Sequence, residues 1–187
     1  MVRVIMHGCN GRMGQVITEM IAKEAEMEIV AGVDVSDSVH NTYPVFKTLK
    51  DCDVDADVVI DFANAKAVDG LLDTCVAKSL PCVLCTTGLS EEQLAHVKEA
   101  SGKVAILRSA NMSMGINVLS ELCKRASAIL GANYDIEIVE QHHHNKLDAP
   151  SGTALMLADA INEENDGAYH YVYDRSSVRQ KRDPCLL

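Results

Sequence analysis

Five short apolar runs, separated by stretches with helical periodicity, occupy the first hundred or so residues of the chain. The runs cover 2–6, 28–33, 57–61, 81–85 and 103–107, and the helical stretches include 13–25, 65–78 and 90–100. Strands joined by helices of ten or more residues are parallel, because the chain crosses over before it re-enters the sheet. Nearly continuous apolar runs of this kind fit a sheet buried on both faces. The pattern predicts an α/β fold with a parallel sheet.

The composition is that of a folded protein with an acidic surface. Apolar residues make up 48% of the 187 residues, and 17 basic against 27 acidic side chains give a formal net charge of -10. An acidic surface disfavours nucleic acid, whose phosphates bind cationic side chains. No run approaches the roughly 20 apolar residues that span a bilayer. We therefore expect neither a nucleic-acid nor a membrane partner.

The seven cysteines are scattered and lie mostly within apolar runs. An odd, dispersed set is typical of reduced thiols in the cytoplasm rather than of a disulfide framework. Cys82 and Cys85 form a C-x-x-C pair, but no second pair stands at a zinc spacing. We expect these two side chains to pack in the core, in preference to redox or metal chemistry.

Glycines occupy positions 8, 11 and 14, directly between the first predicted strand and the first predicted helix, in the segment Gly8-Cys9-Asn10-Gly11-Arg12-Met13-Gly14. Absent side chains let a pyrophosphate approach the backbone, and the helix N-terminus offers unpaired N–H groups. Asp34 ends the second predicted strand 20 residues after Gly14, where an acid accepts hydrogen bonds from an adenosine ribose. The combination predicts a Rossmann-type dinucleotide-binding domain; the alternative is that the glycines serve only a tight turn.

The Asp34 carboxylate also bears on the choice of cofactor. It repels the 2′-phosphate of NADPH and so favours NADH, but Arg12 offsets part of this repulsion and use of both stays open. Two segments follow the fourth and fifth predicted strands, where open α/β sheets bind ligands. They are Cys85-Thr86-Thr87-Gly88 and Ser109-Ala110-Asn111-Met112. We expect them to line the nicotinamide half of the cofactor; the alternative is that each is merely a loop.

The second half of the chain follows a different pattern. Residues 115–130 and 152–164 have helical periodicity, and residues 134–140 alternate as a half-exposed strand does. Within the first half, the polar segment 37–54 is expected to be a loop with one short strand. We place the boundary after residue 112, with a dinucleotide-binding domain over 1–112 and a second domain, of α+β type, over 113–187.

Cationic and proton-transferring groups gather between Glu140 and Thr153. Three histidines, 142–144, precede Lys146, and Ser151-Gly152-Thr153 opens a helix. Histidine titrates near neutrality and suits proton delivery, while a helix N-terminus can hold a carboxylate. An anion-binding, proton-donating site is favoured over a solvated loop. A metal site is least favoured, because adjacent histidines alternate faces and no further ligand stands at a zinc spacing.

Three segments together resemble a known enzyme family. They are Gly8-x-x-Gly11-Arg12-Met13-Gly14, Cys85-Thr86-Thr87-Gly88 and Glu140-x-His142-His143-x-x-Lys146-x-Asp148-Ala149-Pro150-Ser151-Gly152-Thr153. In order and spacing they are similar to dihydrodipicolinate reductase, also called 4-hydroxy-tetrahydrodipicolinate reductase, of the diaminopimelate route to lysine. The resemblance implies an NAD(P)H-dependent oxidoreductase. A hydride would attack C4 of a cyclic imine dicarboxylate, and a proton would be added at C3.

The resemblance also implies residue roles. His142 and Lys146 would donate protons in catalysis. His143, Gly152 and Thr153 would hold the carboxylates of the substrate. The cofactor contacts would come from Gly8, Cys9, Asn10, Gly11, Arg12, Met13, Asp34, Cys85, Thr86, Thr87, Ser109, Ala110, Asn111 and Met112. No metal is implied.

The last residues depart from the family pattern. Relatives continue for several dozen residues beyond residues 176–183, and those residues supply sheet strands that mediate tetramer formation. We therefore expect a truncated or frameshifted chain with an incomplete α+β substrate-binding and oligomerisation domain, in which the family's homotetramer is doubtful. Two other hypotheses stay open: another small-substrate NAD(P)-dependent dehydrogenase, and an inactive fragment that at most binds dinucleotide.

Overall fold

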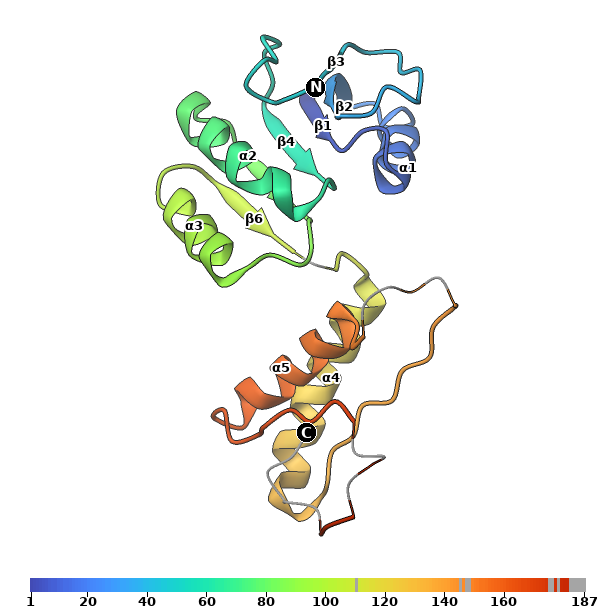
Figure 1. The fold of residues 1–187 in the computed structure, drawn as a ribbon, viewed down its shortest axis with the longest axis vertical. Coiled ribbons are helices and arrows are strands. Elements are labelled where there is room, and N and C mark those ends of the chain that lie inside the picture. The colour runs from blue at the N-terminus through green and yellow to red at the C-terminus, as the bar shows by residue number, and fades with distance from the viewer. Residues whose placement is uncertain (110, 145, 147–148, 175–176, 178, 182–187) are drawn as a thin grey trace. The chain divides into compact units, whose positions relative to one another are not determined.

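The structure is a computed structural model that describes residues 1–109, 111–144, 146, 149–174, 177 and 179–181. The chain forms two compact units, Met1–Ala110 and Asn111–Leu187, which are described separately (Figure 1). The first unit contains β1 (Val2–His7), α1 (Arg12–Ile21), β2 (Met27–Val33), β3 (Val45–Phe46), β4 (Val58–Asp61), α2 (Ala65–Lys78), β5 (Cys82–Leu84), α3 (Glu91–Ser101) and β6 (Ile106–Arg108).

The six strands of the first unit form one sheet in the order β3-β2-β1-β4-β5-β6, and every neighbouring pair is parallel. This confirms the predicted α/β fold with a Rossmann-type sheet. The strand order reverses direction at β1 and β4, and ligands of open α/β sheets bind outside the carboxyl ends of the strands at such a point. His7 ends β1 and Asp61 ends β4, so both residues lie at that edge.

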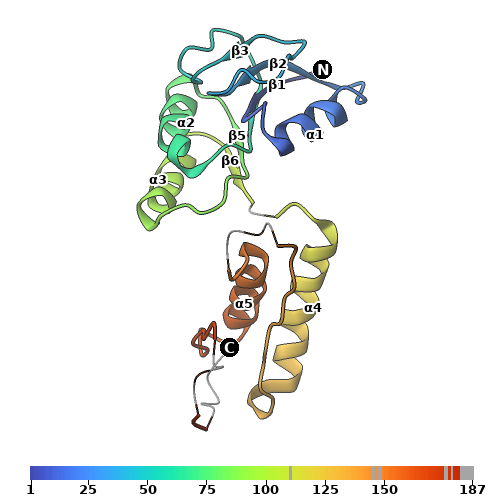
Figure 2. The same cartoon turned by 45° about the vertical axis from the view of Figure 1, so that its right-hand side comes forward.

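The sheet is buried on both faces, as its apolar strands predict. Helices α2 and α3 lie side by side on one face and α1 lies on the other (Figures 1 and 2). Successive residues of β1 point to opposite faces. Ile5 accordingly joins the core beneath α2 and α3, whereas Met6 packs with Ile17 of α1 and Tyr43.

Local sequence signals account for the ends of several elements. Ser90 and Gln93 form a reciprocal capping box that starts α3. The predicted strand over 103–107 begins only at Ile106, because the N–H groups of Lys103 and Val104 still donate to the carbonyl of Ala100. Helix α1 likewise ends at Ile21 rather than near residue 25, since short turns of i to i+3 type follow it.

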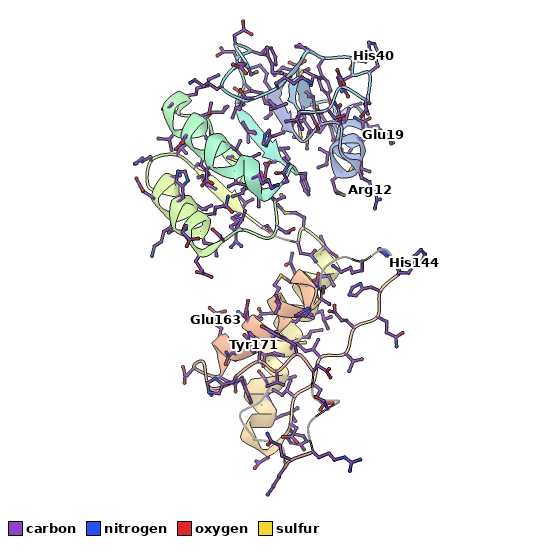
Figure 3. The ribbon with its side chains drawn as sticks, in the orientation of Figure 1. Arg12, Glu19, His40, His144, Glu163 and Tyr171 are labelled. Carbon is purple, nitrogen blue, oxygen red and sulfur yellow. The ribbon has the colours of Figure 1, made fainter. Side chains whose placement is uncertain are left out.

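The second unit is built around two packed helices, α4 (Met114–Leu130) and α5 (Gly152–Glu164), with the short 3₁₀ turn η1 (Gly131–Asn133) after α4. Lys124 Nζ and Glu163 Oε2 pair at 2.9 Å between the two helices, and Figure 3 shows Glu163 on α5. Ser151 caps α5, since its hydroxyl accepts from the N–H of Ala154 at 3.0 Å. This start of α5 is the predicted one.

The prediction of a strand over residues 134–140 is wrong. The segment follows η1 as irregular chain, and no other part of the described chain pairs with it as a strand. Alternation of polar and apolar residues gives a segment two different faces, but a strand also needs a neighbour that accepts and donates its backbone hydrogen bonds. The alternation could not supply that neighbour.

The C-x-x-C pair is part of the core. Cys82 and Cys85 are free and buried, as are Cys9, Cys52 and Cys75, which confirms the expected packing role. In the described parts of both units, no helix is both long and apolar enough to cross a membrane.

Candidate functional site

The glycine loop lies tightly against the end of β4. Gly8 has a φ of +81°, and a Cβ placed on it would stand 2.7 Å from the carbonyl oxygen of Phe62. A Cβ on Gly14 would collide with the carbonyl oxygen of Gly8. Both positions therefore require glycine, because the loop backbone has no room for side chains on these sides. The strand passes directly into α1 through a turn in which Gly11 N–H donates to Gly8 O at 3.1 Å.

The acid at the end of β2 is joined to this loop. Asn10 N–H donates to Asp34 Oδ2 at 2.9 Å, and Ser36 N–H donates to Oδ1 at 2.9 Å. The side chain of Asn10 donates in turn to Ser36 O at 2.6 Å. Each carboxylate oxygen still has a lone pair for another donor. The arrangement fixes Asp34 beside the loop and leaves it able to accept hydroxyl groups of a ribose.

A cavity of about 1110 Å³ opens along this edge of the sheet. Four predicted cofactor residues line it: Gly8, Asn10, Gly11 and Asp34. Several lysines line it as well, and the ammonium of Lys47 donates to Val35 O at 2.9 Å, next to Asp34. The residues present therefore fit a dinucleotide: a backbone cradle for phosphates, an acid for a ribose, and cations nearby.

Three other predicted residues of the loop region do not line this cavity. The Cys9 side chain is fully buried, and burial, followed by the charge of Asp34, raises the pKa of its thiol to about 11. Only its backbone can reach a ligand. Arg12 and Met13 are exposed at the start of α1, where Figure 3 shows Arg12.

The segment after β5 turns two of its predicted residues inward. Cys85 is buried, and burial, followed by the charge of Asp61, raises the pKa of its thiol to about 11. Thr86 is 6% exposed, and its hydroxyl donates to Asp61 Oδ2 at 2.6 Å. Thr87 is exposed. Of these three side chains, only that of Thr87 is open to a ligand at the surface of this unit.

Sequence reasoning missed Asp61, which binds the Thr86 hydroxyl, and His7, which pairs with Asp61. Asp61 is fully buried, and its Oδ1 lies 2.6 Å from Nδ1 of His7, which is 7% exposed. His7 also lines the cavity. One signal was available: each is a polar residue that ends an otherwise apolar run, at the carboxyl end of a strand.

In the second unit, two predicted residues with different roles are in contact. Asn111 Nδ2 donates to the Thr153 hydroxyl at 3.0 Å, and Asn111 Oδ1 accepts from Ser113 N–H at 2.8 Å. Met112 is half exposed. Ser109 follows β6 in the first unit, where its N–H donates to Leu84 O. Ala110 lies outside the described residues.

A carboxylate links His142 to the start of α5. Glu140 Oε2 lies 2.6 Å from Nε2 of His142, and Glu140 Oε1 accepts from Ser151 N–H at 2.8 Å. These hydrogen bonds, that of His142 first, lower the pKa of Glu140 to about 2. Glu140 opens the quoted signature, but no role was predicted for it. It is the group that orients His142.

The remaining predicted residues of this region are His143, Lys146 and Gly152. Lys146 N–H donates to His143 O at 3.1 Å, which places both in one turn, and Gly152 is exposed as the first residue of α5. A separate cavity of about 480 Å³ is lined by Glu140, Pro150 and Tyr171 among others, but not by His142, Lys146 or Thr153. No group of three His, Cys, Asp or Glu among the described residues could hold a metal ion.

Two family models match the chain: dihydrodipicolinate reductase, N-terminus, over residues 2–112, and dihydrodipicolinate reductase, C-terminus, over residues 115–184. The 4-hydroxy-tetrahydrodipicolinate reductase of Caldanaerobacter subterraneus subsp. tengcongensis is 49% identical over 184 residues, which cover 98% of this chain and 72% of the relative. The enzyme of that name from Clostridium tetani is 46% identical over 185 residues, with the same coverage.

Solved structures agree with these matches. Dipicolinate-bound dihydrodipicolinate reductase from Paenisporosarcina sp. TG-14 has a TM-score of 0.69 at 26% identity and covers 98% of this chain and 72% of that chain. A myo-inositol 2-dehydrogenase from Lactobacillus plantarum, at 11% identity and a TM-score of 0.53, shares the fold alone. The matches span both units and include the segments that carry the glycine loop and the histidine signature. The chain belongs to the dihydrodipicolinate reductase (4-hydroxy-tetrahydrodipicolinate reductase) family.

Proposed function

We propose that this chain reduces (2S,4S)-4-hydroxy-2,3,4,5-tetrahydrodipicolinate, by way of dihydrodipicolinate, to tetrahydrodipicolinate with NAD(P)H, in the diaminopimelate route to lysine. The observation that carries the proposal is the identity of 49% to an enzyme of that name over 98% of the chain. The geometry of the two candidate sites supports it. The free, buried cysteines further support a reducing compartment, and we place the reaction in the cytoplasm.

Residues 1–112 would hold the dinucleotide, which supplies a hydride when bound. The loop of Gly8, Asn10 and Gly11 would hold the phosphates through backbone N–H groups, and Asp34 would accept the adenosine ribose hydroxyls. Cys9, Arg12 and Met13 would contribute through their backbone or at the rim of the site. Thr87 and the segment of Ser109, Ala110, Asn111 and Met112 would border the nicotinamide half, with Cys85 and Thr86 behind them.

Residues 113–187 would hold the substrate. His143, Gly152 and Thr153 would bind its carboxylates, because an exposed helix N-terminus favours anions and an imidazole N–H can donate to a carboxylate oxygen. Addition of a hydride at C4 leaves an electron-rich enamine whose C3 takes up a proton. His142 and Lys146 would supply that proton, with Glu140 holding the imidazole of His142 in place.

The cofactor preference follows from the charges around Asp34. The carboxylate favours NADH, because it repels a 2′-phosphate. Lys47, whose ammonium lies 2.9 Å from the carbonyl of the residue after Asp34, and Arg12 would offset this repulsion. We therefore propose that the chain uses both cofactors, with NADH preferred.

The experiment is an NADH-oxidation assay with substrate generated enzymatically from pyruvate and aspartate semialdehyde, beside a panel of other oxo acids. Turnover confined to the generated substrate would support the assignment. His142→Ala and Lys146→Ala should each lower kcat by about 10² to 10⁴, the range for a lost general acid. His170→Ala serves as the control, because His170 lies outside the signature. If the two signature variants match the parent, the catalytic assignment is wrong.

A further inference from the structure

The buried pair of His7 and Asp61 lies within the candidate cofactor site without a role in the mechanism above. Asp61 Oδ1 accepts hydrogen bonds from Nδ1 of His7 at 2.6 Å and from the N–H of Ala63 at 3.2 Å. Asp61 Oδ2 accepts from the Thr86 hydroxyl at 2.6 Å. The three side chains come from the ends of β1 and β4 and from the segment after β5, which are neighbours in the sheet. The network therefore crosses the edge where the cavity opens.

The bonds to Asp61 fix which nitrogen of His7 carries a proton. A carboxylate can only accept, so the hydrogen bond at 2.6 Å places a proton on Nδ1. In the neutral ring Nε2 is then an acceptor. Among the residues that the structure describes, Nε2 has no hydrogen-bond partner. The side chain is 9% exposed, and an unpaired buried acceptor is rare unless a ligand or water completes it.

The strand order indicates which part of a dinucleotide would meet this nitrogen. Along the sheet edge lie Asp34 after β2, the glycine loop after β1, then Asp61 on β4 and Thr86 after β5. A dinucleotide with its adenosine ribose at Asp34 and its phosphates on the glycine loop passes next over the ends of β1 and β4. The part that follows the phosphates is the second ribose. Its hydroxyl groups are donors, whereas phosphate oxygens would face Nε2 as a second acceptor.

We propose that Nε2 of His7 accepts a hydrogen bond from a hydroxyl of the nicotinamide-side ribose, and that Asp61 holds the imidazole in the tautomer this requires. The proposal rests on the proposed function in one respect, the seating of a dinucleotide in this cavity. It assigns a cofactor-binding role to His7 and a positioning role to Asp61. Because Asp61 also holds Thr86, the ribose contact is tied to the segment after β5.

The test compares ligands that differ by one ribose, using the full chain and isothermal titration with ADP, ADP-ribose and NADH. His7→Phe should weaken ADP-ribose and NADH by about fivefold, the effect of one lost hydrogen bond, and leave ADP unchanged. His7→Gln, whose amide oxygen is an acceptor, should keep part of the binding. If His7→Phe does not fold, the ratio of the ADP-ribose and ADP dissociation constants is measured for His7→Gln and compared with that of the parent. His96→Phe is the matched control, since His96 also pairs with a carboxylate, at 2.9 Å from Asp69, but does not line the cavity.

The outcomes separate this proposal from the proposed function. If the parent binds ADP and the ratio of ADP to ADP-ribose affinity does not change in the His7 variants, the role of His7 is wrong and the cofactor site stands. An equal loss for all three ligands would mean that His7 only supports the fold. If the parent binds neither ADP nor NADH, the cofactor site itself is wrong.

Discussion

Asn111 Nδ2 donates to the hydroxyl of Thr153 across 3.0 Å, which joins the segment before α4 to the first turn of α5. The family resemblance implies different ligands for these two residues, the cofactor for Asn111 and the substrate for Thr153. Their contact means that a change at one is transmitted to the other. Both residues belong to the second unit, so the contact orders the start of α5 within that unit.

Thr153→Val is expected to raise the KM for the dicarboxylate substrate by about five- to tenfold. In the proposed site it would remove one hydrogen bond to a substrate carboxylate, and it also removes the hydroxyl to which Asn111 Nδ2 donates. Thr153→Ser keeps the hydroxyl and should stay close to the parent. Steady-state kinetics with substrate varied at saturating NADH provide the measurement. Equal KM values for the Val and Ser variants would remove Thr153 from the substrate site.

Glu140→Gln is expected to lower the stability of the second unit at neutral pH. The difference in stability between the parent and the variant should depend on pH. The folded pKa of Glu140 lies at about 2, below its ordinary value of 4.5, because His142 and the backbone of Ser151 bind its charged form. The stabilisation is therefore complete above about pH 4.5 and is lost as the pH falls toward about 2.

Melting temperatures of parent and Glu140→Gln, measured from pH 7 downward, check this sign. The gap between the two proteins should be constant near neutrality and should narrow below about pH 4.5. Glu137→Gln is the control, since it lies in the same segment and does not bind Ser151 N–H. A gap that widens on acidification would contradict the assigned direction of the pKa shift.

Features set by neighbouring residues were predicted well. The start of α3 near residue 90, the start of α5 after Ser151 and the glycine loop before α1 all depend on residues within a few positions of one another. Each could be found because the chain carries the donor, the acceptor and the required flexibility in one short stretch. The buried cysteines likewise followed from the apolar runs around them.

Features that depend on strand order were missed. His7 and Asp61 are 54 residues apart and Thr86 is a further 25 along, and only the order β1-β4-β5 makes them neighbours. Periodicity predicts strands but does not order them. The inward orientation of the Thr86 hydroxyl could not be predicted for the same reason, because its partner is a buried carboxylate on another strand. The irregular segment 134–140 shows the converse, a strand-like pattern without a strand to pair with.

Gly14→Ala is expected to abolish dinucleotide binding and to lower the melting temperature. Its Cβ would collide with the backbone oxygen of Gly8, and backbone cannot move aside as the end of a side chain can. The loop would have to shift away from α1 and from its position beside Asp34.

Gly115→Ala is the matched control in α4, where the nearest atom to the new Cβ is 3.8 Å away. That change should stabilise by about 0.5 to 1 kcal/mol. NADH titration and thermal unfolding of both variants provide the measurements.

Lys47→Ala is expected to raise the KM for NADPH by about fivefold while changing that for NADH by less than about twofold. The ammonium of Lys47 lies beside the carbonyl of Val35, in the cavity that Asp34 also lines, so it is placed to offset the repulsion between Asp34 and a 2′-phosphate. An exposed charge contact of this kind contributes about 1 kcal/mol and weakens with salt. The preference for NADH should therefore be larger in the variant than in the parent, and this difference between the two proteins should shrink at high ionic strength. Lys103→Ala is the control, since Lys103 pairs with Glu99 at 2.7 Å outside the cavity. Equal effects of Lys47→Ala on both cofactors would show that the lysine acts on the shared part of the dinucleotide, and the selectivity would then have to come from Asp34 and Arg12.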